Sequence, residues 1–178
     1  HVQLSPEEEA QYKEARGVYT SFLRAQHIHM AAPNGWQQFI IRASRSAEGR
    51  RAMQAYREQK RIAQAATGKL EKLWQILCDH RDDRTIIFTA DNALAYQIGE
   101  SFVLPVLTHQ TKAKERKWML EQFGKGALTT LVTSKVLNEG VDVPEAAVGV
   151  VVSGSGSVRE HVQRLGRILR HRPGTVSY

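Results

Sequence analysis

Residues 85–92, Thr85-Ile86-Ile87-Phe88-Thr89-Ala90-Asp91-Asn92, are the stretch that decides the fold of this chain. The first half is a short apolar and β-branched run, which is typical of a strand buried on both faces. The second half is polar, and a helical pattern follows over residues 92–102. A buried strand that leads directly into a helix is the repeating unit of a parallel sheet covered by helices.

The same alternation continues on both sides of this stretch. It predicts further helices at 69–80, 111–123 and 158–170, and further strands at 106–107, 129–133 and 148–152. Ligands of parallel sheets bind at the carboxyl ends of the strands. In this chain those ends are small and polar, and most open a helix, where free backbone amides suit phosphate oxygens. They comprise residues 89–92, 108–110, 133–135 and 153–156.

The residues before position 67 follow a different, purely helical pattern. Ser5-Pro6-Glu7-Glu8 predicts a helix start with an N-cap, a proline at the first helical position and a capping box. That helix is expected to end near residue 26, and two more are expected, one from Trp36 and one over 47–66 after a Ser46 cap. We therefore predict a small all-helical appendage, residues 1–66, in front of an α/β domain, residues 67–178.

The positive charge of the chain is concentrated in the helical appendage. The formal net charge is +7, and between Lys13 and Arg61 ten bases stand against three acids, which alone gives +7. A localised basic surface attracts polyanions, and counterion release makes such binding strongly dependent on salt. The alternative is that these side chains form solvated helix faces.

Other classes of protein are disfavoured by composition. No apolar run approaches the length that spans a bilayer, and no signal peptide is visible, so no membrane partner is expected. Cys78 is the only cysteine and is expected in a helix core, which leaves no disulfide framework. His27 and His29 stand close together without a third ligand, so no metal site is predicted.

The stretch Gln163-Arg164-Leu165-Gly166-Arg167-Ile168-Leu169-Arg170 carries the clearest chemistry. On a helix Gln163, Arg167 and Arg170 fall at i, i+4 and i+7 and point to one face. Two permanently charged guanidiniums on one face suit the negative charge that develops on a γ-phosphate during phosphoryl transfer. The alternative is a solvated, arginine-rich helix.

A second chemical stretch, residues 133–144, precedes it by one strand. Gly140 allows a backbone to come close to a ligand, and Asp142 can accept hydrogen bonds from ribose hydroxyls. Alone, these two residues are equally compatible with a tight turn closed by an Asx hydrogen bond.

In this order and at this spacing, residues 85–89, 134–144 and 163–170 resemble motifs IV, V and VI of superfamily 2 helicases. The resemblance implies a RecA-like sheet of the P-loop NTPase type, with Arg167 and Arg170 as γ-phosphate arginines and Arg170 as the arginine finger. It also assigns contact residues. The nucleotide would be contacted by Gly140, Asp142 and Gln163, and the nucleic-acid backbone by Thr89, Asn92, Thr108, His109 and Ser134.

The finer resemblance is to the XPB-type DNA helicases of prokaryotes. Residues 108–111, 135–142 and 152–157 are similar to members of that family, and residues 4–12 and 22–25 resemble the entry to its thumb-like helical insertion. This resemblance implies 3′ to 5′ movement on single-stranded or forked DNA, roles in repair and transcription, and a cytoplasmic, nucleoid-associated location. Within the thumb-like region we expect Arg42 and Arg45 to contact DNA. Gln163 stands where the RNA-directed DEAD-box branch usually has His, which disfavours that branch.

The chain lacks the other half of an ATPase site. No G-x-x-x-x-G-K-[ST] loop occurs, and no Asp-Glu pair follows an apolar strand. In the resembled family these elements belong to a preceding RecA-like domain, which would bind most of the ATP and Mg²⁺. We therefore expect a fragment of a longer protein that is inactive alone and works with that upstream domain. Some archaeal relatives also have a nuclease partner, and the sequence leaves open whether this chain has one.

Two other functions stay open at this point. One is a non-catalytic DNA-binding module, in which the basic helices bind and the α/β part is a scaffold. The other is a double-stranded DNA translocase of the chromatin-remodeller or restriction type, which shares motifs V and VI.

Overall fold

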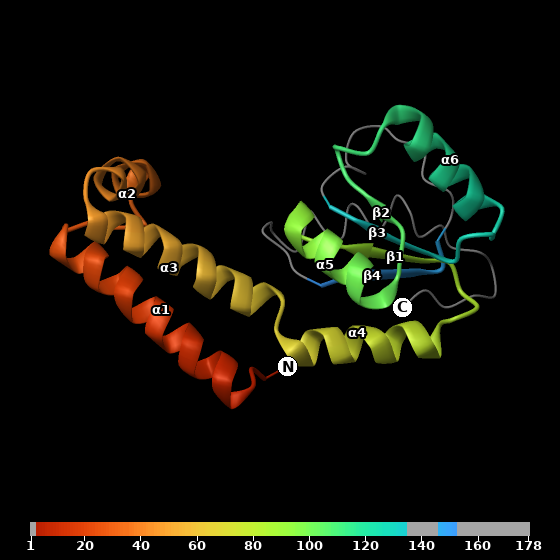
Figure 1. Cartoon of the computed structure of the whole chain (residues 1–178), viewed down its shortest axis with the longest axis horizontal. Helices are drawn as coiled ribbons and strands as arrows, with labels where there is room; N and C mark the ends of the chain where they lie inside the picture. The colour runs from red at the N-terminus through yellow and green to blue at the C-terminus, as the bar shows by residue number, and fades with distance from the viewer. Residues whose placement is uncertain (1–2, 135–145, 153–178) are drawn as a thin grey trace. The chain divides into compact units, whose positions relative to one another are not determined.

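The computed structural model describes residues 3–134 and 146–152 (Figure 1). The chain divides into two compact units, residues 1–68 and residues 69–178. Among the described residues no helix is both long and apolar enough to cross a membrane.

The first unit consists of α1 (Pro6–Ala25), α2 (Gly35–Ser44) and α3 (Ala47–Gln64). The long helices α1 and α3 lie side by side, and the short α2 also packs against α3. The predicted capping box of α1 is confirmed: the Glu8 amide donates to Ser5 Oγ over 3.2 Å, and the Ser5 amide donates to Glu8 Oε2 over 2.9 Å. The predicted Ser46 cap of α3 is confirmed as well, because its hydroxyl accepts from the Gly49 amide at 2.9 Å.

An aromatic cluster holds the three helices of the first unit together. Phe39 of α2 is fully buried and meets Tyr19 of α1 edge to face, with the ring centroids 5.3 Å apart. Tyr56 of α3 lies 5.3 Å from Tyr19 and 5.1 Å from Trp36. Each such pair contributes about 0.5–1.5 kcal/mol beyond the burial of its area, so this cluster fixes how the helices meet.

The second unit is built on a parallel four-stranded sheet in the order β2-β3-β1-β4. The strands are β1 (Thr85–Phe88), β2 (Val106–Leu107), β3 (Thr130–Thr133) and β4 (Val148–Val151). The helices are α4 (Thr67–Asp79), whose first two residues belong to the first unit, α5 (Asn92–Phe102) and α6 (Ala113–Gly124). This parallel sheet flanked by helices confirms the predicted α/β fold.

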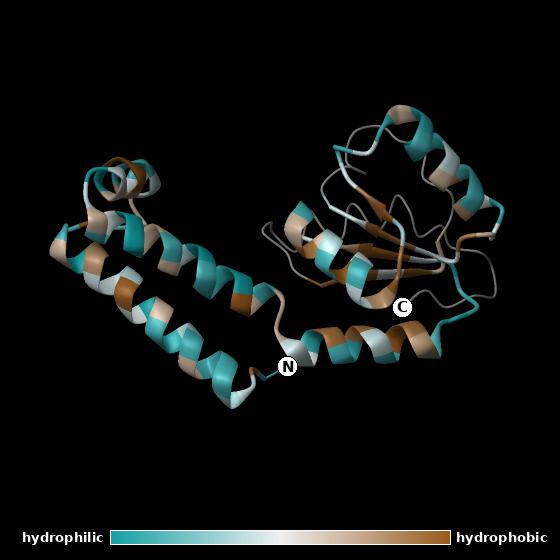
Figure 2. Cartoon of the chain, in the orientation of Figure 1, coloured by the Kyte–Doolittle hydropathy of each residue, from teal (hydrophilic) through white to brown (hydrophobic). Residues whose placement is uncertain are grey.

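Helices cover both faces of the sheet, as the unbroken apolar strands predict. Figure 2 shows the strands in the hydrophobic colour, whereas the helices carry both colours. Ile86 and Phe88 of β1 belong to one core cluster with Phe123 of α6. Ile87 points to the opposite face because side chains alternate along a strand, and α5 packs against β2 and β3. Gly99 allows that approach, since a Cβ there would lie 2.2 Å from a Val106 methyl.

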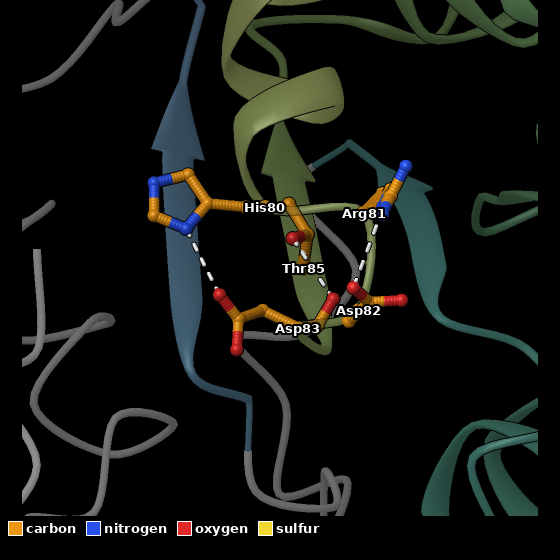
Figure 3. A network of polar contacts seen from close by, with 5 residues as sticks. All are labelled: His80, Arg81, Asp82, Asp83 and Thr85. Carbon is orange, nitrogen blue, oxygen red and sulfur yellow. Dashed lines mark hydrogen bonds and ion pairs between the residues drawn. The ribbon is translucent and has the colours of Figure 1, made fainter.

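A polar turn leads into the amino end of β1 (Figure 3). His80 Nδ1 lies 2.9 Å from Asp83 Oδ2, and the Thr85 hydroxyl donates to the Asp83 carbonyl at 3.3 Å. Arg81 and Asp82 form a pair at 3.4 Å that is almost fully exposed. Exposed pairs of this kind contribute little to stability. The turn therefore serves mainly as the connection between α4 and β1.

One sequence prediction needs correction. Cys78 is exposed, not in a helix core, because it lies on the face of α4 opposite Leu73, which is buried. The predicted helix at 158–170 lies outside the described residues.

One carboxylate of the first unit, that of Glu8, binds at the amino end of α1 and also binds Thr67, which lies in the same unit. Besides capping α1, Glu8 accepts through Oε1 from the Thr67 amide at 2.8 Å and from the Thr67 hydroxyl at 2.7 Å. Thr67 is the first residue of α4, so the positive ends of both helix dipoles meet the same negative charge. Hydrogen bonds from Ser5 and Thr67 hold the pKa of Glu8 below its ordinary value of 4.5.

This clamp predicts an acid-dependent stability. A lowered pKa means that the Glu8 contribution is complete above about pH 5 and is lost as the pH falls through the folded-state pKa. We expect Glu8→Gln to lower the free energy of unfolding near neutral pH, with the deficit shrinking at about pH 3. Urea unfolding followed by helical circular dichroism measures this. Glu14→Gln, at an exposed position of α1, is the control. A deficit for Glu8→Gln that stayed constant with pH would contradict the clamp.

Candidate nucleic-acid interface

The carboxyl ends of three neighbouring strands meet at one edge of the sheet. Thr133 of β3 is level with Phe88 of β1 and with Leu107 of β2. The next residues, Ser134, Thr89 and Thr108, therefore leave the sheet together, and all three are buried. The structure brings these three predicted contact residues into one site.

Asn92 connects the ends of these strands. As the first residue of α5 it follows β1, and its side-chain oxygen accepts from Ser134 Oγ after β3 at 2.6 Å. Its Nδ2 lies 3.1 Å from Nδ1 of His109, which follows β2. One amide side chain therefore links residues from three separate strand ends. All three members of this Ser134–Asn92–His109 network were predicted as contact residues.

The network also determines which nitrogen of His109 carries a proton. The Ser134 hydroxyl donates to the amide oxygen, so the amide nitrogen is the group that faces His109. An amide nitrogen only donates, and Nδ1 must therefore accept. In the neutral ring Nε2 then carries the hydrogen. Because His109 is exposed, this N–H is a fixed donor that suits a phosphate oxygen.

Thr108 is held by side chains that the sequence patterns did not indicate. Its fully buried hydroxyl lies 3.1 Å from the hydroxyl of Tyr96 and accepts from the Gln110 amide at 3.2 Å. The Thr108 amide donates to Thr111 Oγ1 at 2.9 Å, and Arg116 reaches the Thr108 carbonyl at 3.4 Å. The loop that presents His109 is thus fixed from α5 and from α6. Tyr96 and Arg116 lie 12 and 8 residues from Thr108, beyond any local motif.

The hydroxyl of Thr89 is used within the protein. It donates to the Asp91 carbonyl at 2.9 Å and reaches the Thr133 carbonyl at 3.2 Å. Asp91 in turn caps α5, because its side chain accepts from the Leu94 amide at 3.0 Å. Such a cap contributes about 1 kcal/mol. Thr89 therefore orders the start of α5, from which Asn92 extends.

The two predicted arginines of the helical unit differ in their surroundings. Arg42 is half-buried and donates to the Gln26 carbonyl at the end of α1, which gives it a structural role. Arg45 is exposed at the end of α2, and its guanidinium has no ion pair among the residues that the structure describes. Of the two, Arg45 is the one free to meet a ligand.

The predicted phosphoryl-transfer residues lie outside the described residues. These are Arg167, Arg170, Gln163, Gly140 and Asp142. Within residues 3–134 and 146–152, no group of three or more His, Cys, Asp or Glu side chains is arranged to hold a metal ion.

A family model and two similar proteins of known name agree on the family of this chain. Residues 68–172 match the helicase conserved C-terminal domain family. The chain is 36 % identical over 172 residues to the DNA 3′-5′ translocase XPB2 of Sulfurisphaera tokodaii, which covers 97 % of this chain and 39 % of that protein. It is 40 % identical over 114 residues to the DNA 3′-5′ helicase XPB of Mycobacterium tuberculosis, covering 64 % of this chain and 21 % of the relative.

A solved structure shares the fold. The C-terminal domain of the SWI2/SNF2 ATPase of Sulfolobus solfataricus superposes with a TM-score of 0.58 at 18 % identity, over 85 % of this chain and 69 % of that one. The chain thus spans about two fifths or less of the two similar sequences, and its fold recurs in the C-terminal domain of a SWI2/SNF2 ATPase.

The Ser134–Asn92–His109 network predicts a measurable tautomer switch. In Asn92→Asp a carboxylate oxygen, which only accepts, replaces the amide donor that faces Nδ1. We expect the neutral His109 ring to move its hydrogen from Nε2 to Nδ1, as read from the ¹⁵N shifts of the imidazole. Gln110→Glu places a new carboxylate next to His109 in sequence without removing Asn92, and is expected to keep the Nε2–H form. An unchanged tautomer in Asn92→Asp would show that Asn92 does not orient the ring.

Proposed function

The chain belongs to the helicase conserved C-terminal domain family, and we propose that it is the second motor domain of an ATP-dependent DNA helicase or translocase similar to XPB. The observation that carries this proposal is the Ser134–Asn92–His109 network at the carboxyl ends of three parallel strands. These strand ends are where nucleic acids and nucleotides meet parallel sheets. Similarity to a DNA 3′-5′ translocase and a DNA 3′-5′ helicase supports DNA as the substrate and this direction of movement.

In this proposal the described edge of the sheet contacts the DNA backbone. His109 offers an N–H donor whose position Asn92 fixes, and Ser134 and Thr108 hold the loops on either side. Contacts from side chains and helix starts to phosphates position a strand without reading its sequence. A motor that moves along DNA needs this kind of contact, since it must release and rebind at every base.

The proposed role in ATP hydrolysis rests on Arg167 and Arg170. ATP and Mg²⁺ would be bound mainly by an upstream RecA-like domain of the same protein, with Gly140, Asp142 and Gln163 contributing from this chain. When the cleft between the two domains closes, Arg170 would stabilise the charge of the transferred phosphoryl group. The isolated chain would then be inactive. Repair and transcription-linked opening of DNA stay expectations from the resemblance, and the presence of a nuclease partner stays an open question.

The helical unit is proposed as a second DNA contact. Arg50, Arg57 and Arg61 lie at i, i+7 and i+11 on α3, opposite the face that buries Ala52 and Gln59. Glu58 pairs with Arg61 at 2.6 Å, whereas Arg50 and Arg57 are exposed and have no ion pair in the described part of the chain. The 172-residue match to the translocase necessarily includes most of this unit. The unit is thus shared with a protein named for movement on DNA.

This same basic stripe supports the second candidate, a non-catalytic DNA-binding module. The motor function requires motif VI, residues 163–170, for ATP hydrolysis, whereas a DNA-binding module does not. One experiment on this motif therefore distinguishes the two functions. A translocase that does not unwind is the third candidate, and a strand-displacement assay distinguishes it from a helicase.

Arg170→Ala tests the motor function directly. Joined to its upstream RecA-like domain, the protein is expected to hydrolyse ATP when DNA is added, and Arg170→Ala is expected to lower that rate about 10³-fold, because an arginine finger contributes roughly that much. DNA affinity is expected to be unchanged. Arg172→Ala, just beyond the motif, is the matched control. Full DNA-stimulated hydrolysis by Arg170→Ala would overturn the assignment of the finger.

Charge reversal tests the helical unit. Arg45→Glu with Arg57→Glu is expected to weaken binding of the isolated chain to labelled DNA at low salt, and to flatten the dependence of log K on log salt by about two to three, since two phosphate contacts become repulsive. Arg42 is left intact because it also holds the end of α1. Lys114→Glu with Lys125→Glu changes the net charge equally in the second unit. An equal loss in both pairs would show that only net charge matters.

A further inference from the structure

A hollow of about 410 Å³ lies at the carboxyl end of α1, in the first unit. Its lining includes the apolar side chains of Leu23 and Ile28 and the exposed side chains of Arg24, His27 and His29, which carry nitrogen donors. Thr20 also lines it, but the Thr20 hydroxyl donates to the Arg16 carbonyl at 2.8 Å. The donors available to a ligand are therefore one guanidinium and two imidazoles.

The backbone that forms this hollow is held in an unfavourable conformation. Helix α1 ends in a Schellman motif: the His27 amide donates to the Arg24 carbonyl at 3.1 Å, and the Ile28 amide donates to the Leu23 carbonyl at 2.9 Å. His27 occupies the left-handed position of the motif with φ of +50°, where glycine is usual. Keeping a side chain there costs stability, and such strain tends to persist where the side chain has a function.

Several of the carbonyls that would repel an anion at this helix end already accept hydrogen bonds. The carboxyl end of a helix carries partial negative charge on its free carbonyls. Here the Arg42 guanidinium of α2 donates to the Gln26 carbonyl. The other carbonyls with backbone donors are those of Phe22, Leu23 and Arg24.

The surroundings of the hollow are positively charged. No Asp or Glu occurs in the sequence between Glu14 and Glu48, a range that includes all six lining residues. Arg24 has no ion pair within residues 3–134 and 146–152, and it is exposed. Arg42 and Arg45 add two more charges from α2. None of the six lining residues is acidic, and Arg24 brings a permanent positive charge to the hollow.

We propose that this hollow is a phosphate-binding site and that it holds a backbone phosphate of bound DNA; the second part rests on the proposed DNA-binding role of the helical unit. The Arg24 guanidinium presents a planar fork of N–H donors that matches two phosphate oxygens. The imidazoles of His27 and His29 each donate one N–H in the neutral form. The site orients a strand by its backbone, so it is indifferent to base sequence.

The first arm of the test uses inorganic phosphate and the whole chain. Phosphate replaces chloride at constant ionic strength while the imidazole signals of His27 and His29 are followed by NMR. We expect saturable shifts in the wild type and in Arg16→Gln, which removes one charge two turns earlier on α1. Arg24→Gln is expected to weaken phosphate binding about tenfold, the worth of a charge-assisted hydrogen bond. Shifts that do not saturate, or that survive unchanged in Arg24→Gln, overturn the site.

The second arm uses labelled forked DNA. We expect Arg24→Gln to weaken DNA binding and to reduce the slope of log K against log salt by about one, as for the loss of one phosphate contact. If phosphate binds as expected but Arg24→Gln leaves DNA binding unchanged, the assignment to the DNA backbone is overturned and the hollow takes a free phosphate. If the wild type binds phosphate and does not bind DNA, the proposed role of the helical unit fails while the phosphate site stands.

A third arm separates binding from folding. His27→Gly keeps the left-handed backbone without its strain, so it is expected to raise the temperature of unfolding while it weakens phosphate binding. Val103→Gly is the matched control, because Val103 also has a left-handed φ, of +53°, and is 91 % exposed outside the hollow. It is expected to raise the unfolding temperature without changing phosphate binding. Unaltered phosphate binding in His27→Gly contradicts a role for the imidazole.

Discussion

The second unit depends on one constraint: the strands of a parallel sheet covered by helices have no solvent-facing side. Ile86, Ile87, Leu131 and Val132 are almost wholly buried, so the strands themselves cannot carry polar chemistry. Polar side chains therefore collect where the strands end, and a parallel arrangement puts the carboxyl ends on the same edge. Asn92 can connect Ser134 and His109 for this reason alone: all three leave the sheet at one edge.

How far the sequence could predict the structure depends on the distance between interacting residues. The capping box of α1 is local, since Ser5 and Glu8 are three residues apart, and the sequence indicated it correctly. The other bonds of Glu8 go to Thr67, 59 residues away, and no pattern indicates a pairing at that separation. The strands were predictable because burial on both faces leaves a continuous apolar run.

In the candidate site, too, the features that follow from chain order were predictable and the long-range contacts were not. Thr89, Asn92, Thr108, His109 and Ser134 were predicted by their positions after strands, which is information that the chain order contains. The groups that support them were not: Tyr96 reaches Thr108 from the outer face of α5, and Arg116 reaches it from α6. An exposed tyrosine or a half-buried arginine on a helix is unremarkable in sequence. Each of these side chains supports Thr108 only because its helix packs beside the end of the strand.

The helical unit must both pack its three helices together and carry positive charge on its outer faces. Its three helices are held by aromatic contacts among Phe39, Tyr19 and Tyr56, which leave the outer faces free to carry charge. A helix that ends in a tight reversal normally has glycine at the left-handed position, because glycine alone avoids the steric cost. His27 at that position sacrifices stability that glycine would provide, at a point where the Schellman hydrogen bonds are otherwise complete. The exposed side chain supports no part of the aromatic core, so the fold itself gives no reason to retain it. A ligand that the imidazole binds supplies that reason.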